Sequence, residues 1–518
     1  MKSRNPICIV LALVGVWGCA DEFKVPGYIP KPPDSLPLFI DRGDLGQPLT
    51  EGEIAEFTQT MAGFFETSDY FRWASWHSHG LADHNQWGQP GYRIWWTNTS
   101  AVKAGDTVTF TRTGWPDNTT AKVGRVLPAA ISVYLASEDP VAGKLALDYV
   151  RGLSADYDGN IWGDEDPVVP GIMARVIFHR NHAYELEGGR KVAVDYESVR
   201  QEDEGRRHDT VHNPDNPTWG DVWVRNKRSK DDFPYLYRDV PLLHRLAWTA
   251  RDKQMRDAAI KLAGQIKGMA RDMVEHGYVI RTKDADGQPC IPYMEDGVTV
   301  DDFACFNSWD ILFPDAECNP KLCTAYLAEG EALGNACGNG QKLEYESAAI
   351  ANQYWASNMI WNYHLTAISL ALAYGDLANW QRLLEGYADR MDSMMTDDRA
   401  GQYVEWNHDL AQLLVLGAAY GLPLKADEAR LIISEFSKAA EFYGNFDKWD
   451  LWAPGVPDGE HEYIPDRFVY DGGTDPLDSY VRITEIIDLF EYCHSQTKDP
   501  QGTTFIDCGV LLESATAL

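Results

Sequence analysis

The sequence predicts a mainly α-helical protein built from helical hairpins, with small β insertions near residues 92–112 and 174–196. From Tyr235 onward, apolar residues recur with the helical period of about 3.6, in paired segments joined by Gly, Pro or Asp turns. The two insertions instead alternate apolar and polar residues, around Lys103–Asp106 and around a turn at Glu187–Gly189. Together these patterns indicate a large helical body interrupted twice by short strands.

Apolar periodicity places about eleven helices along the chain. Asp139 followed by Pro140 signals that one helix stops and the next begins. Consecutive helices with short connections pack antiparallel, and about a dozen of them can close into an α/α toroid. We therefore predict an α/α toroid over residues 39–518. The expected helices span residues 51–71, 124–135, 141–153, 236–250, 254–276, 321–333, 345–374, 377–395, 409–420, 426–443 and 476–494.

Residues 1–19 have the composition of an export signal peptide. Lys2 and Arg4 form a basic start, Ile7–Trp17 is an unbroken apolar run too short to span a bilayer, and the small residue Gly18 precedes Cys19. The end of this run resembles the cleavage site of bacterial lipoproteins, in which the cysteine carries the lipid. An ordinary secretory signal is the alternative. In both cases the mature chain is outside the cytoplasm, and lipid on Cys19 would anchor it to the membrane of a bacterial envelope or at the cell surface.

A proline-rich segment follows at residues 20–38, with five prolines between Val25 and Leu38. This density of proline prevents helix formation and favours an extended, semi-rigid spacer. We predict that the segment is a tether and that the folded body begins near Phe39.

Charge excludes one class of partner. The net charge of −32 would repel nucleic acid phosphates, and the chain has no run of Lys and Arg that could form a basic patch. We therefore expect no nucleic-acid partner.

Seven of the nine cysteines fall in two late clusters, between Cys290 and Cys337 and at Cys493 and Cys508. In an oxidising compartment this distribution predicts up to three disulfides and a leftover thiol. Cys493 with Cys508 is the simplest pairing. A zinc site that uses Cys318 and Cys323 is the alternative for the first cluster.

At the level of architecture alone, the helical pattern of residues 51–494 resembles the toroids of bacterial extracellular carbohydrate-active enzymes. These include chondroitin-type and alginate-type polysaccharide lyases and six-hairpin glycosidases. The resemblance implies a surface-anchored enzyme that degrades an acidic, uronate-containing polysaccharide by β-elimination. Two alternatives stay open. One is an inverting glycoside hydrolase, which would pair Glu405 with a distant Asp471 or Asp475, and the other is a non-catalytic glycan-binding or structural lipoprotein.

Residues 175–245 are the best candidate for the chemistry. Here 13 Lys and Arg balance 13 Asp and Glu, so the segment is neutral in an acidic chain, and a polar loop is expected over residues 212–232. β-Elimination needs a base beside the uronate carboxylate and a group that neutralises that carboxylate. The resembled lyases combine Asn, His, Tyr and Arg for these roles. A solvated charged loop with packed tyrosines is the alternative. We assign the base or acid to His212 or Tyr237, and the carboxylate contacts to Asn213, Arg225, Asn226 and Arg238.

Aromatic and amide side chains suggest where a saccharide would bind. Aromatic faces suit the C–H faces of sugar rings, and neighbouring polar groups can bond the hydroxyls. A metal site at the histidines near residue 80, or ordinary packing, is the alternative. The predicted substrate-binding residues are Trp76, His77, His79, His84, Asn85, Trp87, Trp219, Tyr363 and His364.

Calcium is the one cofactor that the sequence suggests, although the predicted reaction requires none. Asp156, Asp158, Asn160 and Asp164 place oxygen ligands at alternate positions, as calcium loops do. The stretch departs from the EF-hand pattern at two positions, so an acidic surface turn is the alternative.

Overall fold

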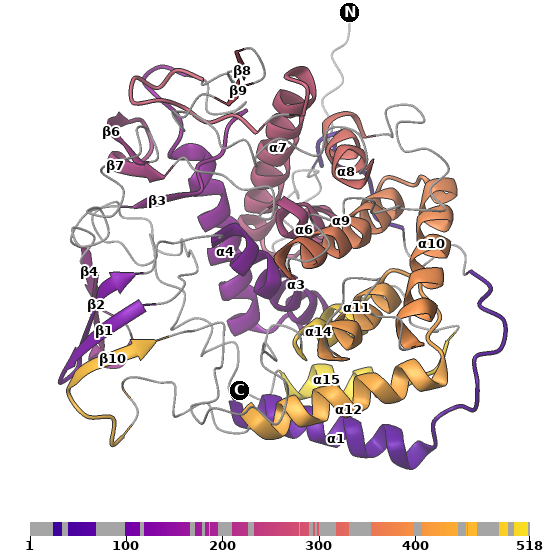
Figure 1. The fold of residues 1–518 in the computed structure, drawn as a ribbon. Coiled ribbons are helices and arrows are strands. Elements are labelled where there is room, and N and C mark those ends of the chain that lie inside the picture. Colours follow the sequence, from indigo (N-terminus) through magenta and orange to yellow (C-terminus); the bar gives the residue numbers. More distant parts are fainter. Residues whose placement is uncertain are drawn as a thin grey trace, which may run out of the picture.

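The structure is a computed structural model that describes residues 24–33, 40–68, 99–113, 119–165, 171–178, 182–185, 187–194, 210–225, 233–278, 280–289, 294–295, 298–299, 318–330, 354–396, 407–443, 452, 454–463, 486–495 and 502–515. These residues are mainly helical, as the sequence predicts (Figure 1). None of the helices among them combines the length and the hydropathy that a bilayer crossing requires.

Twelve helices lie in the described residues, and each of the predicted helical segments overlaps one of them. The additional helix, α15, is a short one that the periodicity did not reveal. The bounds are α1 (Glu51–Ser68), α3 (Thr119–Ser137), α4 (Pro140–Asp158), α6 (Phe233–Thr249), α7 (Lys253–Glu275), α8 (Cys318–Glu329), α9 (Tyr354–Ala373), α10 (Leu377–Met395), α11 (Asn407–Ala419), α12 (Ala426–Tyr443), α14 (Asp488–His494) and α15 (Cys508–Ser514).

Aspartate side chains begin several of these helices. Asp139 accepts a hydrogen bond from the backbone N–H of Ala142 at 2.7 Å, and Pro140 is the first residue of α4. Asp252 caps α7 in the same way, by accepting from the N–H of Gln254 at 2.6 Å. Each cap satisfies an N–H that has no partner in its own helix and is worth about 1 kcal/mol. The stop-and-restart signal at Asp139–Pro140 is confirmed.

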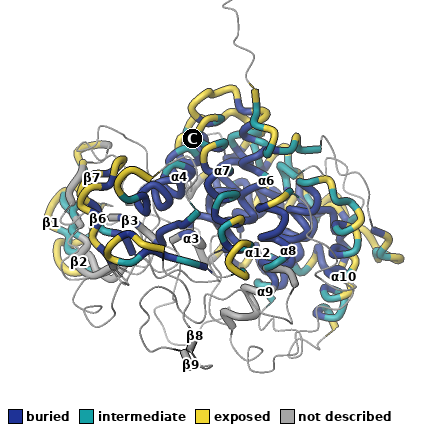
Figure 2. The backbone as a smooth tube through the Cα atoms, turned by 90° about the horizontal axis from the view of Figure 1, so that it is seen from above, coloured by how far each residue is buried: buried dark blue, intermediate teal, exposed yellow. Residues whose placement is uncertain are grey.

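Five helices contact one another in a closed series. α3 contacts α6, α6 contacts α9, α9 contacts α11, α11 contacts α14, and α14 returns to α3. In α9, every side chain from Trp361 to Ala373 is buried, which is expected of a helix enclosed on all sides. α7, α10 and α12 contact this series with one buried stripe each, whereas α4, which contacts α3, is buried over most of its length. Figure 2 shows the result, with buried backbone at the centre and exposed backbone at the periphery.

The described residues also form three small sheets, the largest with strand order β10-β1-β2-β5-β4. β1 and β2 form a hairpin whose turn contains Gly105 at φ +59, and β4 and β5 form another around Gly188 and Gly189. Strands therefore occupy both predicted insertions. The bounds are β1 (Thr99–Ala104), β2 (Thr107–Thr113), β3 (Val176–Phe178), β4 (His182–Glu185), β5 (Lys191–Val194), β6 (Thr210–Asn216), β7 (Gly220–Arg225), β8 (Met294–Glu295), β9 (Val298–Thr299) and β10 (Gly459–Tyr463).

Residues 210–225 form a β-hairpin, so the prediction of a polar loop is wrong for this stretch. β6 and β7 pair antiparallel, with His212 opposite Trp223. The register shifts after Asn213, which accommodates Pro214 because proline cannot donate a ladder hydrogen bond. The prolines concealed a strand pattern that is carried by alternating valines.

The N-terminal segment already packs against the helices before Phe39, where we expected the folded body to begin. Ile29 is only 2% exposed and shares an apolar cluster with Ala247 of α6 and Ala263 of α7. The predicted tether therefore includes a stretch that is docked on the body. Cys19 lies outside the described residues.

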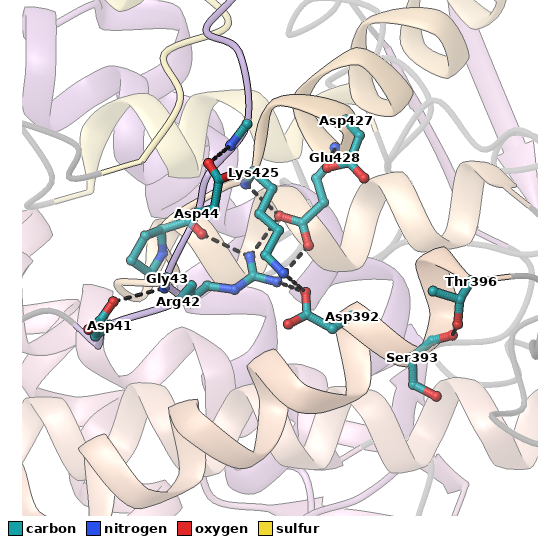
Figure 3. A network of polar contacts seen from close by, with 12 residues as sticks. Asp41, Arg42, Gly43, Asp44, Asp392, Ser393, Thr396, Lys425, Asp427 and Glu428 are labelled. Atoms are coloured by element: carbon teal, nitrogen blue, oxygen red, sulfur yellow. Dashed lines mark hydrogen bonds and ion pairs between the residues drawn. The ribbon is translucent and has the colours of Figure 1, made fainter.

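A buried arginine joins the next stretch of chain to the C-terminal helices. Arg42, with its side chain 1% exposed, donates from both terminal nitrogens to Glu428 of α12 at 2.7 Å and also bonds Asp392 of α10 (Figure 3). It also donates to the carbonyl of Pro423 at 2.8 Å. Burial opposes the charge of Arg42, but the carboxylates of Glu428 and Asp392 outweigh burial and raise its pKa. The segment near residue 42 is thus fixed by a paired buried charge.

We expect Arg42→Met to lower the free energy of unfolding by about 3–5 kcal/mol, because Glu428 would remain buried without its partner. Arg430→Met is the matched control, since the pair of Arg430 with Glu53, at 3.3 Å, is exposed on both sides. That variant should lose less than about 1 kcal/mol. Urea unfolding measures both changes, and equal losses would contradict a special role for the buried pair.

The predicted disulfide between Cys493 and Cys508 is confirmed, and it joins the end of α14 to the start of α15 across a sequence separation of 15. Cys323 in α8 is a buried thiol that donates to the carbonyl of Tyr363 at 3.6 Å and is not disulfide-bonded. Cys290, Cys305 and Cys337 lie outside the described residues.

Replacing both Cys493 and Cys508 by Ser should lower the free energy of unfolding by about 3 kcal/mol, the chain-entropy value for a loop of this length. Thermal unfolding with and without a reductant provides the control. The reductant should lower the Tm of the wild-type protein toward that of the double variant and leave the double variant unchanged. A wild-type Tm that survives complete reduction of this bond would refute the expectation.

Candidate functional site

A cleft of about 720 Å³ opens along α7. Its walls come from α7, the turn after α4, residues 281–289 and the N-terminal segment. A volume of this size lies within the range of about 300–1,000 Å³ that is common for small-molecule sites. The side chains that give the cleft its chemistry are Tyr28, Asn160, Lys267, Arg271, Arg281 and Lys283.

The outer face of α7 forms the floor of the cleft, while its opposite face carries methionine and aliphatic side chains into the main core. Gly264 and Gly268 lie one turn apart on this floor, and so do Lys267 and Arg271. A Cβ atom at position 264 would come within 2.9 Å of the Tyr28 hydroxyl. Glycine at this position therefore lets the N-terminal segment approach the helix closely.

Two asparagines of β6 hold the turn that forms the opposite wall. Asn213 Nδ2 donates to the carbonyls of residues 159 and 161 at 3.2 and 2.8 Å. Asn216 Nδ2 lies within 2.8–3.1 Å of the carbonyls of residues 158, 159 and 161. Both asparagines are buried, where such bonds are stronger than in water. The hairpin thus fixes the turn that carries Asn160.

Asn160 brings an unsatisfied amide to the cleft. Its side chain is 2% exposed, and neither its oxygen nor its nitrogen has a hydrogen-bond partner among the described residues. Leaving a buried polar group unpaired costs about 1–3 kcal/mol, so such a group usually has a functional explanation. The amide offers one acceptor and a pair of donors to a polar ligand in the cleft.

Salt bridges hold most of the cations in place. Arg281 bonds Asp272 through two nitrogens, Lys283 pairs with Glu165, and Arg271 lies 3.6 Å from a carboxylate of α8. Four cations and three carboxylates line the cleft, whereas the whole chain has a net charge of −32. With the α8 carboxylate counted, the charges at the cleft balance, so it is much less negative than the protein as a whole and the more favourable place for an anionic ligand.

Lys267 differs from the other cations because it forms no ion pair within the described part of the chain. Its Nζ atom lies 5.9 Å from the ring centroid of Tyr28, within the range of a cation–π contact. Burial lowers the pKa of Lys267, and the positive charge of Arg271 lowers it further. Lys267 is thus the cation most available to a carboxylate of a ligand.

The predicted calcium ligands have other surroundings. Asp156 and Asp158 belong to the last turn of α4, and Asp158 bonds Lys261 at 2.5 Å and Gln265 at 2.9 Å. Asp164 is exposed. The described residues contain no group of three or more His, Cys, Asp or Glu side chains that could hold a metal ion.

His212 lies on the hairpin and not in the cleft. Its Nε2 atom is 2.5 Å from an oxygen of Asp221, and its ring stacks on Trp223 with centroids 4.6 Å apart. Because side chains alternate along a strand, His212 points away from the face on which Asn213 clamps the turn. His212 and Asp221 are both exposed.

The other predicted catalytic residues are not brought together with His212. Tyr237 is fully buried, and its hydroxyl lies 3.4 Å from a methionine sulfur and from a threonine hydroxyl. Arg238 is 2% exposed and lies 3.7 and 3.9 Å from two carboxylates of α14. Arg225 is buried at the end of β7, and Asn226 lies outside the described residues.

The predicted substrate-binding residues that the structure describes are buried. Trp219 and Tyr363 are each 1% exposed. His364 bonds the carbonyl of Leu383 at 2.9 Å, and burial lowers its pKa to about 4, so it is a neutral core residue. The remaining candidates, and the carboxylates suggested for a hydrolase, lie outside the described residues: Trp76, His77, His79, His84, Asn85, Trp87, Glu405, Asp471 and Asp475.

The cations of the cleft are functional candidates that the sequence analysis missed. A signal was present, because Lys267 and Arg271 flank Gly268 on one face of a predicted helix. Their relation to residues 160 and 283 depends on the tertiary structure. No family model, no curated protein and no solved structure matches this chain.

Asn216→Ala should lower the free energy of unfolding by about 2 kcal/mol, because it removes the Nδ2 bonds to the 158–161 turn and leaves the buried N–H of Trp219 without the Asn216 oxygen that accepts from it at 2.7 Å. Asp215→Ala, at the exposed neighbouring position, is the matched control and should stay within about 0.5 kcal/mol of the wild type. Chemical unfolding of both variants tests this. A free energy of unfolding for Asn216→Ala equal to that of the wild type would show that the bonds of the Asn216 side chain do not stabilise the protein.

Proposed function

We propose that this protein binds an acidic saccharide, one that carries uronate carboxylates, in the α7 cleft. The single observation behind the proposal is a cleft in an acidic chain that gathers four cations, with the unpaired amide of Asn160 buried in its wall. Lys267 would bind a carboxylate, and Asn160 would bond sugar hydroxyls.

The proposal also covers the architecture around this cleft and the location of the protein. The closed series of α3, α6, α9, α11 and α14 would be the inner wall of an α/α toroid, and α7 would belong to its outer layer. The export signal, with lipid on Cys19, would place the protein in a bacterial envelope or at the cell surface. Envelope glycans would then be within its reach.

Titration calorimetry with trigalacturonate tests the binding function. We expect saturable binding by the wild-type protein that weakens with added salt, and none with the neutral trisaccharide maltotriose. Lys267→Gln should raise the Kd about tenfold, since one charge-assisted bond is lost.

Lys253→Gln is the matched control, because Lys253 is on the same helix, is largely exposed and pairs with Asp257. It should bind like the wild type. Absence of wild-type binding to trigalacturonate, and to oligosaccharides of alginate and chondroitin, would refute the proposal. Equal loss in the two lysine variants would reduce it to a general charge effect.

β-Elimination at the same cleft is the second candidate, favoured by the position of Lys267 one turn from Arg271 in the cleft floor, where burial and Arg271 lower the pKa of Lys267. A neutral Lys267 amine would take the proton at C5 of a bound uronate. The C5–H electron pair would form the C4=C5 bond while the C4–O bond breaks, and the departing oxygen would take a proton from water. Arg271 would offset the charge that builds on the carboxylate.

An ultraviolet absorbance time course with polygalacturonate, alginate and chondroitin distinguishes these functions, with reducing ends read in parallel. Rising absorbance that is lost in Lys267→Gln and kept in Lys253→Gln would establish elimination. Reducing ends without absorbance would favour a hydrolase. Binding without either product would leave the binding function alone.

A further inference from the structure

The stretch of chain just after the export signal is docked between α6 and α7. Ile29 is buried with Ala247 and Ala263, and its carbonyl accepts a hydrogen bond from the indole of Trp248 at 3.3 Å. The N–H of Ile29 donates to the carbonyl of Pro26 at 3.0 Å, which closes a turn. Residues 25–29 therefore have a defined conformation on the body.

This turn places Tyr28 at the rim of the cleft. The Tyr28 hydroxyl donates to the carbonyl of Ile260 at 3.2 Å, across 232 positions of sequence. Its ring is close to Lys267, at 5.9 Å, and its hydroxyl is seated against Gly264. Tyr28 is the one aromatic side chain among the described residues that line this cleft.

We infer that Tyr28 is a ligand-contacting residue of the cleft and that Ile29 is the residue that positions it. The inference rests on the proposed function, because it assigns an aromatic contact to the saccharide that Lys267 and Asn160 would hold. The ring of Tyr28 supplies an apolar face for sugar C–H groups beside the Lys267 ammonium. The carboxylate of the ligand would thus contact Lys267 while the face of its sugar ring contacts the adjacent Tyr28.

Docking and ligand binding then stabilise each other. The apolar cluster that holds Ile29 is small, so the docked segment is a low-stability part of the structure. A ligand that touches Tyr28 favours the docked state, and by linkage the docked state favours the ligand to the same extent. A substitution that releases the segment therefore weakens binding even where it does not touch the ligand.

The position of the segment also limits how far the cleft can lie from a membrane to which Cys19 is anchored. Tyr28 is nine residues after Cys19 in the sequence. A fully extended chain of that length spans about 30 Å. With lipid on Cys19, Tyr28 at the rim of the cleft would remain within that distance of the membrane surface, so the saccharide would be one found close to a membrane.

Four single variants of the full chain test the inference, with trigalacturonate as the probe in calorimetry. Tyr28→Ala removes the ring, and Tyr28→Phe keeps it. Ile29→Asp places a charge in the apolar cluster and releases the segment without altering a residue that lines the cleft. Val510→Asp is the matched control, because Val510 is 43% exposed on α15.

We expect the Kd to rise about tenfold for Tyr28→Ala and for Ile29→Asp, within the usual range of coupling between sites. Val510→Asp should bind like the wild type, and Tyr28→Phe, which keeps the ring and loses the bond to Ile260, should fall between the wild type and Tyr28→Ala. In hydrogen exchange, the amide of Ile29 should be protected further by trigalacturonate in the wild type and exchange fast in Ile29→Asp.

Wild-type affinity in Tyr28→Ala and Ile29→Asp, with fast exchange at residue 29 in the latter, would overturn the inference and leave the proposed function standing. Absence of binding by the wild-type protein would overturn the proposed function and this inference with it. Weaker binding by Val510→Asp to the same extent would show a general loss of stability and would also overturn the inference.

Discussion

The two faces of α7 must satisfy opposite demands, and the rest of the cleft depends on this constraint. One face is packed with methionine and aliphatic side chains against the core. The other face lines the cleft, and at Gly264 it must lack a side chain so that Tyr28 of the N-terminal segment can pack against it. Buried bonds from Gln265 and Lys261 to Asp158 fix α7 against α4, which sets the width between floor and wall. A side chain larger than glycine at position 264 would collide with the Tyr28 hydroxyl at the floor of the cleft.

Much of the fold could be predicted because its signals are local. The 3.6-residue period located the helices, and the Asp139–Pro140 pair marked the start of α4 because cap and proline act within one turn. The turns at Gly105 and Gly188 need positive φ, which glycine reveals directly. Cys493 and Cys508 could be paired because few alternatives lay close in the sequence.

The site could not be predicted in the same way, because its residues meet only in three dimensions. Tyr237 was a candidate acid or base, but most residues of α6 are buried and the Tyr237 hydroxyl contacts core atoms. Asn213 was expected to grip a substrate carboxylate, yet its amide is already bonded to the carbonyls of a turn. Burial of each helix face and the path of the N-terminal segment decide such questions, and a single sequence does not encode them in any local pattern.

The Arg42 contact has a consequence for the order in which the chain acquires its structure. Arg42 finds its carboxylates 350 and 386 positions later, and the hydroxyl of Thr58 accepts from the backbone of Asp507, 449 positions later. During synthesis, Arg42 and Thr58 are therefore without these partners until most of the chain has been made. Here the closing contacts are supplied by the part that arrives last.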